Sequence, residues 1–503
     1  MTAAAAVATT TTDQISSQRP ARRSVRTLVG ILAAGALLRL WALGAVGFNS
    51  DEAVYAGQAA SIAGDDVLTP LFPVFRAHPL LFQTTLSLMF LGGVSDVAAR
   101  LLPVAFGLGT VVLTFLLGKR MYGQQAGLVA AALLAAMPYH VVVTRQVLLD
   151  GPLTFFAVLT AYCVTRFCLD GERRWLHFAG AALGLAVLTK EIAVILGVAI
   201  LVFFLLRRDI HVPWRTAAVS GAVAAAIMIM YPLSLQFAGR SGTGQNYLWW
   251  QLFRRPNHGL AFYVETVPLA IGPAVLLLAA AGLWLLRRRA SWRETFLLCW
   301  ILVPLTFFEL WPVKGYQYLV VIAPALTLLA SRTVVHSFPV WPPVRAAVIV
   351  TAVLSLAVPS WLAITAPPSA AFLAGSGGVP KGREAGEWIR ANLPEGAAVI
   401  TIGPSMANLV RFYGNRKSYA LSVSTNPLRR NPSYVPIDNP DRQLRQGELN
   451  YVVWDAYSAN RTTFYSQQLM TYVHRYRGVL LHTEELDVAG RTTPVIMVYE
   501  VRP

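Results

Sequence analysis

Long runs of apolar residues, repeated along most of the chain, restrict its fold more than any other sequence feature. Segments such as Thr27–Gly47, Ala217–Met230 and Ala346–Leu362 hold few charged side chains, and about 20 apolar residues span the hydrocarbon core of a bilayer. Only 13% of the 503 residues are charged, where soluble domains carry roughly 25%. The chain therefore cannot be a series of water-soluble domains, and we expect most of it to lie in a membrane.

We interpret eleven apolar runs as membrane-spanning helices, and a twelfth run differs from them in that it falls in a long loop. The twelfth run, Pro79–Val94, has 16 residues, fewer than the ~17–25 that usually cross a bilayer. We expect it to lie in the membrane interface, with a second short helix near 53–63 in the same loop. The predicted spans are 27–46, 100–118, 126–143, 151–169, 176–189, 191–206, 216–237, 267–286, 295–310, 316–332 and 346–364.

Basic residues between the spans support this assignment and predict the orientation. If Pro79–Val94 does not cross, five basic clusters fall on the same side as the N-terminal tail, and such clusters are retained in the cytoplasm. We therefore predict a cytoplasmic tail over 1–26, a transmembrane domain over 27–364 and a long first external loop over 47–99. The clusters are Lys119/Arg120, Arg173/Arg174, Arg207/Arg208/Arg215, Arg287/Arg288/Arg289/Arg293 and Arg332/Arg345.

From residue 365 onward the composition is that of an ordinary soluble sequence, which predicts a small external α/β domain over 365–503. The formal net charge of +17 is shared between this domain and the cytoplasmic loops, so we expect membrane lipids and no nucleic acid among the partners. A helix is predicted over Lys381–Leu393, short strands over 397–402, 450–454, 479–482 and 494–501, and a long loop over 425–447.

Asp51 and Glu52, directly after the first span, form the sharpest charged motif. Ionisable side chains at membrane depth cost a few kcal/mol each, so those next to span ends are functional candidates. Neighbouring side chains on a helix point in different directions, which favours separate roles for the two acids. The motif also suits a helix start with Ser50 or Asp51 as N-cap, and both interpretations stay open.

Other polar residues lie at predicted outer span ends. Asp150 precedes Gly151-Pro152, where it is either a second functional acid or a helix cap. Arg76 and His78 open the interfacial run, where snorkelling at the membrane surface is the alternative role. Lys314 and Tyr318 begin the tenth span, and interface anchoring would also explain them. Together these residues suit a carboxylate that accepts a proton from a hydroxyl, opposite cations that hold a phosphate.

The aromatic residues of Asn246–Gln251 lie in the loop 239–266, where they would line an acceptor groove or anchor the loop at the interface. We favour interface anchoring.

In the order and spacing of these motifs, residues 27–364 resemble membrane glycosyltransferases of the GT-C class, in particular the branch that contains protein O-mannosyltransferases and the lipid A aminoarabinose transferase. The long first external loop with interfacial helices also matches that class. The motifs are Asp51-Glu52, His78-Pro79-Leu80, Arg100-Leu101-Leu102-Pro103, the segment 118–123, Asp150, Leu188-Thr189-Lys190 and the segment 314–318.

The resemblance implies an inverting glycosyltransferase in the cell membrane. It would take a mannose-like or pentose sugar from a polyprenyl-phosphate donor and transfer it to an acceptor hydroxyl on protein, glycan or lipid at the outer face. The resemblance makes Asp51 the general base and Glu52 and Asp150 supporting acids. It places the donor phosphate on Lys314 and Tyr318, assisted by His78, Arg76, Arg100 or Arg145.

No cofactor is expected. Some GT-C enzymes place DxD-like acids around a divalent ion, but Asp150 has no second acid two residues away, so we do not expect an obligatory metal. The alternative function is a secondary transporter or lipid flippase. Transporters place charges near the bilayer midplane in repeated halves, whereas here the acids gather at one face and no half repeats the other.

Overall fold

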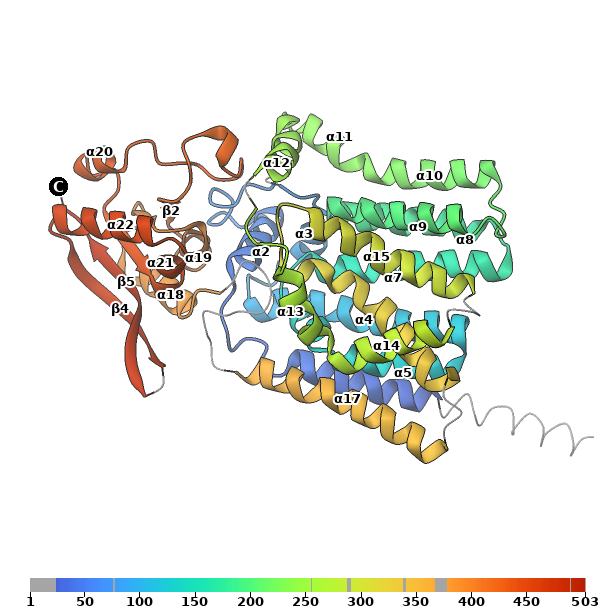
Figure 1. Ribbon diagram of the computed structural model, residues 1–503. Coiled ribbons are helices and arrows are strands. Elements are labelled where there is room, and N and C mark those ends of the chain that lie inside the picture. Colours follow the sequence, from blue (N-terminus) through green and yellow to red (C-terminus); the bar gives the residue numbers. More distant parts are fainter. Residues whose placement is uncertain are drawn as a thin grey trace, which may run out of the picture.

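The computed structural model describes residues 24–75, 77–254, 256–286, 291–337, 341–366, 378–488 and 490–502. They form a helical bundle with a smaller mixed α/β domain at one end (Figure 1). The first described helix, 24–40, starts at the opposite end of the bundle. Arg76, residues 1–23 of the predicted tail and the Arg287–Arg289 cluster lie outside the described residues.

Each of the eleven predicted spans coincides with one helix or with two consecutive helices. After the helix 24–40, the elements of the bundle are α2 (Ser50–Ile62), α3 (Leu81–Ser87), η1 (Leu88–Phe90), α4 (Asp96–Tyr122), α5 (Gln124–Ala136), α6 (Pro138–Val143), α7 (Asp150–Asp170), α8 (Arg174–Thr189), η2 (Glu191–Ala193), α9 (Val194–Leu206), α10 (Trp214–Met228), α11 (Met230–Phe237), α12 (Gly242–Phe253), α13 (Phe262–Ile271), α14 (Pro273–Leu286), α15 (Trp292–Leu310), η3 (Tyr316–Ile322), α16 (Ala323–Arg332), η4 (Thr333–Ser337) and α17 (Pro342–Thr365).

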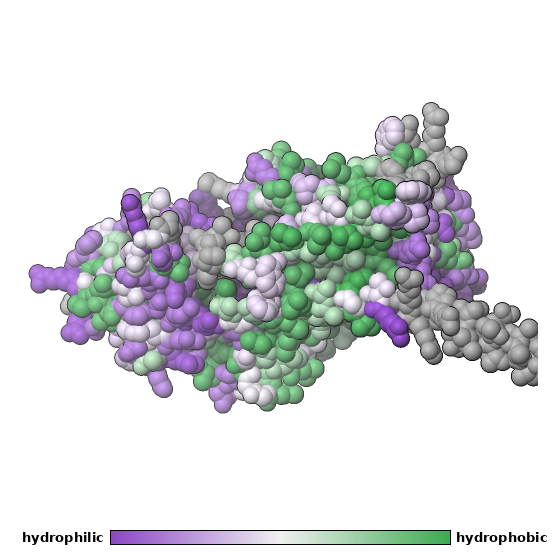
Figure 2. All heavy atoms as spheres, turned by 90° about the horizontal axis from the view of Figure 1, so that it is seen from below, coloured by the Kyte–Doolittle hydropathy of each residue, from purple (hydrophilic) through white to green (hydrophobic). Residues whose placement is uncertain are grey.

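The bundle has the surface of a membrane protein. Figure 2 shows a hydrophobic band over the helical part and hydrophilic surface at both ends, one of them the C-terminal domain. By length and composition alone, five described helices can span a membrane, and the bent pair α13–α14 would make a sixth. The structure thus confirms a mostly helical, polytopic chain, and the number of eleven spans stays a prediction.

The predicted span 267–286 is broken in the structure, because the chain bends there by 95° between α13 and α14. The bend lies at Gly272, whose φ of 97° is open to glycine and strained for other residues. Pro273 follows, and its ring supplies no backbone N–H to continue α13.

The first external loop contains the two expected short helices. The predicted ranges 53–63 and 79–94 correspond to α2 and to α3 with η1. These helices pack on each other through Ala53, Ala56, Phe82 and Leu86, all buried. The same hydrophobic core continues into the C-terminal domain, so the loop joins the two parts of the molecule.

The C-terminal domain is built on a five-stranded mixed sheet in the order β2-β1-β3-β5-β4. β2, β1 and β3 are parallel, β5 is antiparallel to β3, and β4 is antiparallel to β5. Its elements are α18 (Gly382–Asn392), β1 (Ala398–Thr401), α19 (Pro404–Gly414), β2 (Lys417–Ala420), η5 (Pro427–Arg429), α20 (Pro440–Arg445), β3 (Tyr451–Asp455), α21 (Ala456–Arg461), α22 (Thr463–Arg475), β4 (Val479–Val488) and β5 (Arg491–Glu500).

Strand alternation buries both faces of this sheet. Val399 packs with α18 and α19, whereas the next residue, Ile400, packs with α20 and α22. The expected helix and four strands are present, and the expected loop 425–447 is irregular apart from η5 and α20. The sequence interpretation missed β2 and four helices, α19 to α22.

Candidate active site

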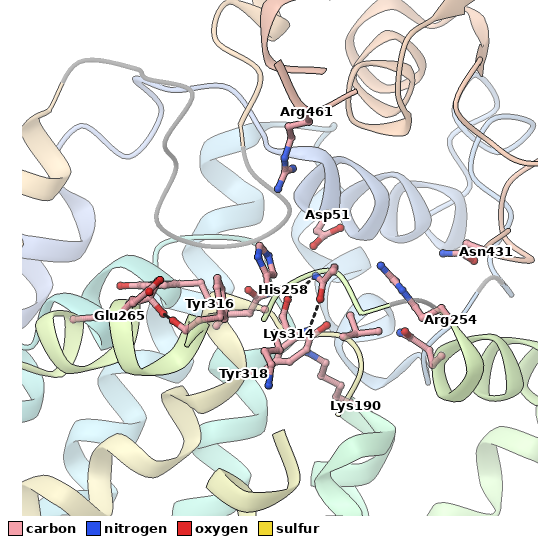
Figure 3. Close-up of a pocket in the computed structure, with 18 of the residues that line it drawn as sticks. Asp51, Lys190, Arg254, His258, Glu265, Lys314, Tyr316, Tyr318, Asn431 and Arg461 are labelled. Atoms are coloured by element: carbon pink, nitrogen blue, oxygen red, sulfur yellow. Dashed lines mark hydrogen bonds between the residues drawn. The ribbon is translucent and has the colours of Figure 1, made fainter. Parts of the chain in front are cut away.

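A cavity of about 1000 Å³ lies where the C-terminal domain meets the helical bundle. Figure 3 shows the charged residues that surround it. The helical part contributes residues from α2, α12, α13 and η3, and the C-terminal domain contributes residues from α21 and the loop after η5. The charged side chains and histidines in its lining are Asp51, His78, Lys190, Arg254, His258, Glu265, Lys314 and Arg461.

Asp51 points to this cavity because another residue caps its helix. Asn49 is the N-cap of α2, and its Oδ1 accepts hydrogen bonds from the backbone N–H groups of Asp51 and Glu52, at 2.9 and 3.0 Å. The expectation that Ser50 or Asp51 caps the helix is therefore wrong. The Asp51 carboxylate is half-buried in the cavity wall, where it is placed to act as a base.

Glu52 has a different role, as the separate directions of adjacent side chains predicted. It is fully buried and forms a bidentate ion pair with Arg100, with N–O distances of 2.8 and 2.9 Å. Its carboxylate also accepts the backbone N–H groups of Asn49 and Val147. Neither Glu52 nor Arg100 lines the cavity. The structure thus places this pair where it joins α2, α4 and the segment before α7.

Asp150 lies behind the cavity wall and holds Lys190 in it. The Lys190 ammonium is 2.9 and 3.0 Å from the two carboxylate oxygens of Asp150, and both residues are buried. Lys190 Nζ also lies 4.2 Å from the ring centroid of Tyr318. Asp150 does not cap α7, since Leu149 occupies the N-cap position. The sequence motif Leu188-Thr189-Lys190 did not by itself identify Lys190 as a site residue.

Lys314 and Tyr318 both line the cavity. Asn257 pairs with the Lys314 backbone through two hydrogen bonds of 2.8 Å. The Lys314 ammonium bonds the backbone carbonyl of Glu309 at the end of α15 and lies 3.5 Å from the Glu309 carboxylate. Cations are stabilised at a helix C-terminus, so this ammonium is held at the cavity floor.

His78 also lines the cavity, whereas Arg145 does not. The His78 ring nitrogen Nδ1 is 2.8 Å from a Glu191 carboxylate oxygen, and the Tyr247 hydroxyl is 3.4 Å from Nε2. Arg145 instead donates to the backbone carbonyls of Leu38 and Trp41, at 2.8 Å each. These two hydrogen bonds connect the first helix and the residues directly after it to the segment that follows α6.

Several residues that line the cavity were not identified from the sequence. The range expected to be a loop, 239–266, contains α12, and Tyr247 and Trp250 on that helix line the cavity. Of the aromatic residues in Asn246–Gln251, Tyr247 and Trp250 thus face the cavity, whereas Trp249 is exposed. Arg254 follows α12 and lies 4.5 Å from the Trp250 ring centroid. The local signal was the aromatic cluster beside a basic residue.

His258 lines the cavity within electrostatic reach of Arg461 and Lys314. Burial, together with the positive charges of Arg461 and Lys314, lowers its pKa, so its imidazole is neutral at pH 7. Its ring stacks on Phe262 at 4.1 Å. Across the described part of the chain, no three His, Cys, Asp or Glu side chains are arranged to hold a metal ion.

Sequence comparison relates the chain to known proteins through its first half. The family of dolichyl-phosphate-mannose-protein mannosyltransferases matches residues 77–235. Two Bacillus subtilis proteins named as candidate mannosyltransferases, YkcB and YycA, are 30% identical over 137 residues and 28% identical over 160 residues. These matches cover 26% and 32% of this chain but only 19% and 22% of the relatives, so the chain matches about a fifth of their length.

Solved structures extend the similarity to the whole fold. ArnT from Cupriavidus metallidurans, in the apo state, superposes with a TM-score of 0.66 at 16% identity, covering 95% of this chain and 98% of ArnT. ArnT bound to undecaprenyl phosphate gives 0.63 at 16% identity, over 95% and 97%. The Archaeoglobus fulgidus oligosaccharyltransferase gives 0.59 at 16%, over 93% and 73%. Residues 77–235 are thus similar to the dolichyl-phosphate-mannose-protein mannosyltransferase family, and the chain as a whole has an ArnT-like fold.

Proposed function

We propose that the protein is an inverting glycosyltransferase that moves a mannose-like or pentose sugar from polyprenyl phosphate to an acceptor hydroxyl on protein, glycan or lipid. The observation that carries this proposal is the cavity itself, in which one half-buried carboxylate, Asp51, faces the cations Lys190 and Lys314. The family relationship of residues 77–235 supports the same class of donor.

The proposed reaction needs one base and a site for the leaving phosphate. The acceptor oxygen forms a bond to the anomeric carbon, the bond from that carbon to the phosphate oxygen breaks, and Asp51 takes the hydroxyl proton. The polyprenyl phosphate leaves as an anion, so no second carboxylic acid has to protonate it, in contrast to hydrolysing glycosidases. Lys190 and Lys314 are fixed before the reaction, which is what stabilises developing charge.

The cavity also suits a lipid donor. One side is formed by apolar residues of α13 and α17, Phe262, Leu269, Ala270 and Ala363. Leu269 is 72% exposed on the bundle surface, so this side of the cavity reaches the lipid. A prenyl chain leaving here would stay in the bilayer while its phosphate reaches the cations. That ArnT binds undecaprenyl phosphate agrees with this arrangement.

The proposed topology has about eleven spans, a cytoplasmic N-terminus and an extracytoplasmic C-terminal domain. At the end of the bundle opposite the C-terminal domain, Arg332 from one of the predicted basic clusters pairs with Glu294 at 2.7 Å. Glu294 also accepts a hydrogen bond from Tyr122, which follows Lys119 and Arg120 in the sequence. Basic loops gather at the cytoplasmic face. This topology places the cavity at the outer face. A transporter or flippase would instead need charges near the middle of the bilayer.

The proposal is tested by supplying purified protein with radiolabelled polyprenyl-phosphate mannose, arabinose and aminoarabinose together with membrane acceptors. We expect one label to move to an acceptor. Movement of the intact donor across a vesicle membrane, with no transfer of sugar, would instead support a flippase.

A further inference from the structure

The C-terminal domain forms the roof of the cavity through the short helix α21. Asp455, at the end of β3, is the N-cap of α21 and accepts the backbone N–H of Ser458 at 2.7 Å. Tyr457 and Arg461 on this helix line the cavity. The Arg461 guanidinium donates to the Tyr457 hydroxyl and lies 4.9 Å from the Tyr457 ring centroid. Arg461 is exposed to the cavity, whereas Tyr457 is buried.

Arg461 and the two lysines approach Asp51 from different sides. Figure 3 shows Arg461 entering from the C-terminal domain and Lys190 and Lys314 from the helical part, with Asp51 between them. The donor phosphate has to lie on the lysine side, because its prenyl chain stays in the bilayer. An acceptor reaches Asp51 from the aqueous side, and therefore passes Arg461.

The roof side of the cavity is basic. Asn431 lines the cavity directly after Arg429 and Arg430, and the surrounding segment 421–437 contains no acidic residue. Arg254 lies at the same end of the cavity, as Figure 3 shows. Among the described residues of the lining, the carboxylates are Asp51 and Glu265, and Glu265 lies at the far end.

We propose that Arg461 binds the acceptor and that the acceptor carries a phosphate or carboxylate close to its reacting hydroxyl. Arginine presents parallel N–H donors that match both groups. An anionic acceptor would be repelled by the Asp51 base, and the Arg461 guanidinium on the acceptor side offsets that repulsion. This proposal rests on the proposed glycosyltransferase function.

Minimal acceptors test the proposal directly. Glycerol 1-phosphate, glycerate and glycerol all offer hydroxyl groups, but the first carries a phosphate, the second a carboxylate and the third no charge. Transfer of radiolabelled sugar from the polyprenyl-phosphate donor to each is measured over a range of acceptor concentrations, with full-length wild type, Arg461→Ala and Arg461→Lys. Arg445→Ala, at an exposed position on α20 of the same domain, is the matched control. Donor binding is measured separately for each variant.

We expect the anionic acceptors to have an acceptor KM at least about tenfold below that of glycerol in the wild type and in Arg445→Ala. Arg461→Ala should remove this advantage without changing donor binding, and Arg461→Lys should keep part of it. Equal KM values for glycerol and the anionic acceptors in the wild type would overturn the proposal, as would an advantage that survives in Arg461→Ala. A comparison of glycerol 1-phosphate with glycerate identifies which anion is preferred. If the wild type transfers sugar neither to these three acceptors nor to the membrane acceptors, the proposed function fails, and this inference fails with it.

Discussion

The Lys190 ammonium is bound by both carboxylate oxygens of Asp150, at 2.9 and 3.0 Å, at the floor of the cavity. Both side chains are buried, and removing one member of a buried pair leaves an uncompensated charge that costs about 3–5 kcal/mol. We therefore expect Lys190→Met and Asp150→Leu each to lower the melting temperature and to weaken donor binding.

The double variant separates the two effects. Replacing a buried ion pair by apolar residues is often neutral for stability, so Lys190→Met/Asp150→Leu should recover most of the melting temperature without recovering donor binding. Recovery of donor binding in the double variant would show that the pair only supports the fold.

Lys314 should contribute to donor binding in the same way. Lys314→Ala removes one cation from the cavity floor, and loss of a charged contact to phosphate weakens binding by about tenfold. The measurement is the donor KM and kcat, with the melting temperature reporting the lost contacts to the end of α15. Unchanged donor KM and kcat would remove Lys314 from the phosphate site.

Glu52 should be required for stability and not for chemistry. Glu52→Ala leaves Arg100 buried without its carboxylate, at a cost of about 3–5 kcal/mol. We expect a large fall in melting temperature and, in the fraction that remains folded, a normal donor KM. If Glu52→Gln were folded and inactive, Glu52 would instead belong to the catalytic groups.

Asp455 predicts a pH dependence of stability. Burial raises its pKa from 3.8 to about 6, so the folded domain must hold an unfavourable buried charge above about pH 6 and holds none below about pH 4. Between these values the free energy of unfolding should fall by about 3 kcal/mol as the pH rises. Asp455→Asn has no such charge, so its melting temperature relative to wild type should increase from pH 4 to pH 6.

Asp441 is the matched control for this measurement. Its pKa is lowered by hydrogen bonds from Arg475 and Tyr476, so its ionised form stabilises the fold and that stabilisation is lost as the pH falls. Asp441→Asn should therefore change the melting temperature in the opposite direction with pH. A difference between Asp455→Asn and wild type that does not vary with pH would contradict the account of Asp455.

The sequence predicted the helical segments well, because each span is a separate apolar run. It did not predict the bend at Gly272, since a Gly-Pro pair inside an apolar run is also compatible with a continuous kinked span. Helix α19 was missed because its buried residues, such as Leu409 and Tyr413, pack against partners distant in sequence.

The site was predicted only in part. Of the residues selected from the sequence, Asp51, His78, Lys314 and Tyr318 line one cavity, because each belongs to a segment that we placed on the same side of the bundle. Arg461 could not be found in this way. It reaches the cavity only because α19 docks on the starts of α2 and α4. There Asn408 donates a hydrogen bond to the Ser50 hydroxyl at 2.9 Å, and the Tyr413 hydroxyl donates one to Asp96 at 2.6 Å. Contacts between domains leave no periodic pattern in the sequence.

The role of Asp51 as general base is the central claim, and the transfer rate of Asp51→Asn tests it most directly. Asparagine keeps the size of the side chain, and Asn49 still caps α2, so the variant should fold and bind donor as the wild type does. Loss of a general base lowers kcat by ~10²–10⁴-fold. Asp66→Asn, at an exposed position in the same external loop, should transfer sugar normally. A near-normal kcat for Asp51→Asn, with radiolabelled donor and membrane acceptors, would contradict the account.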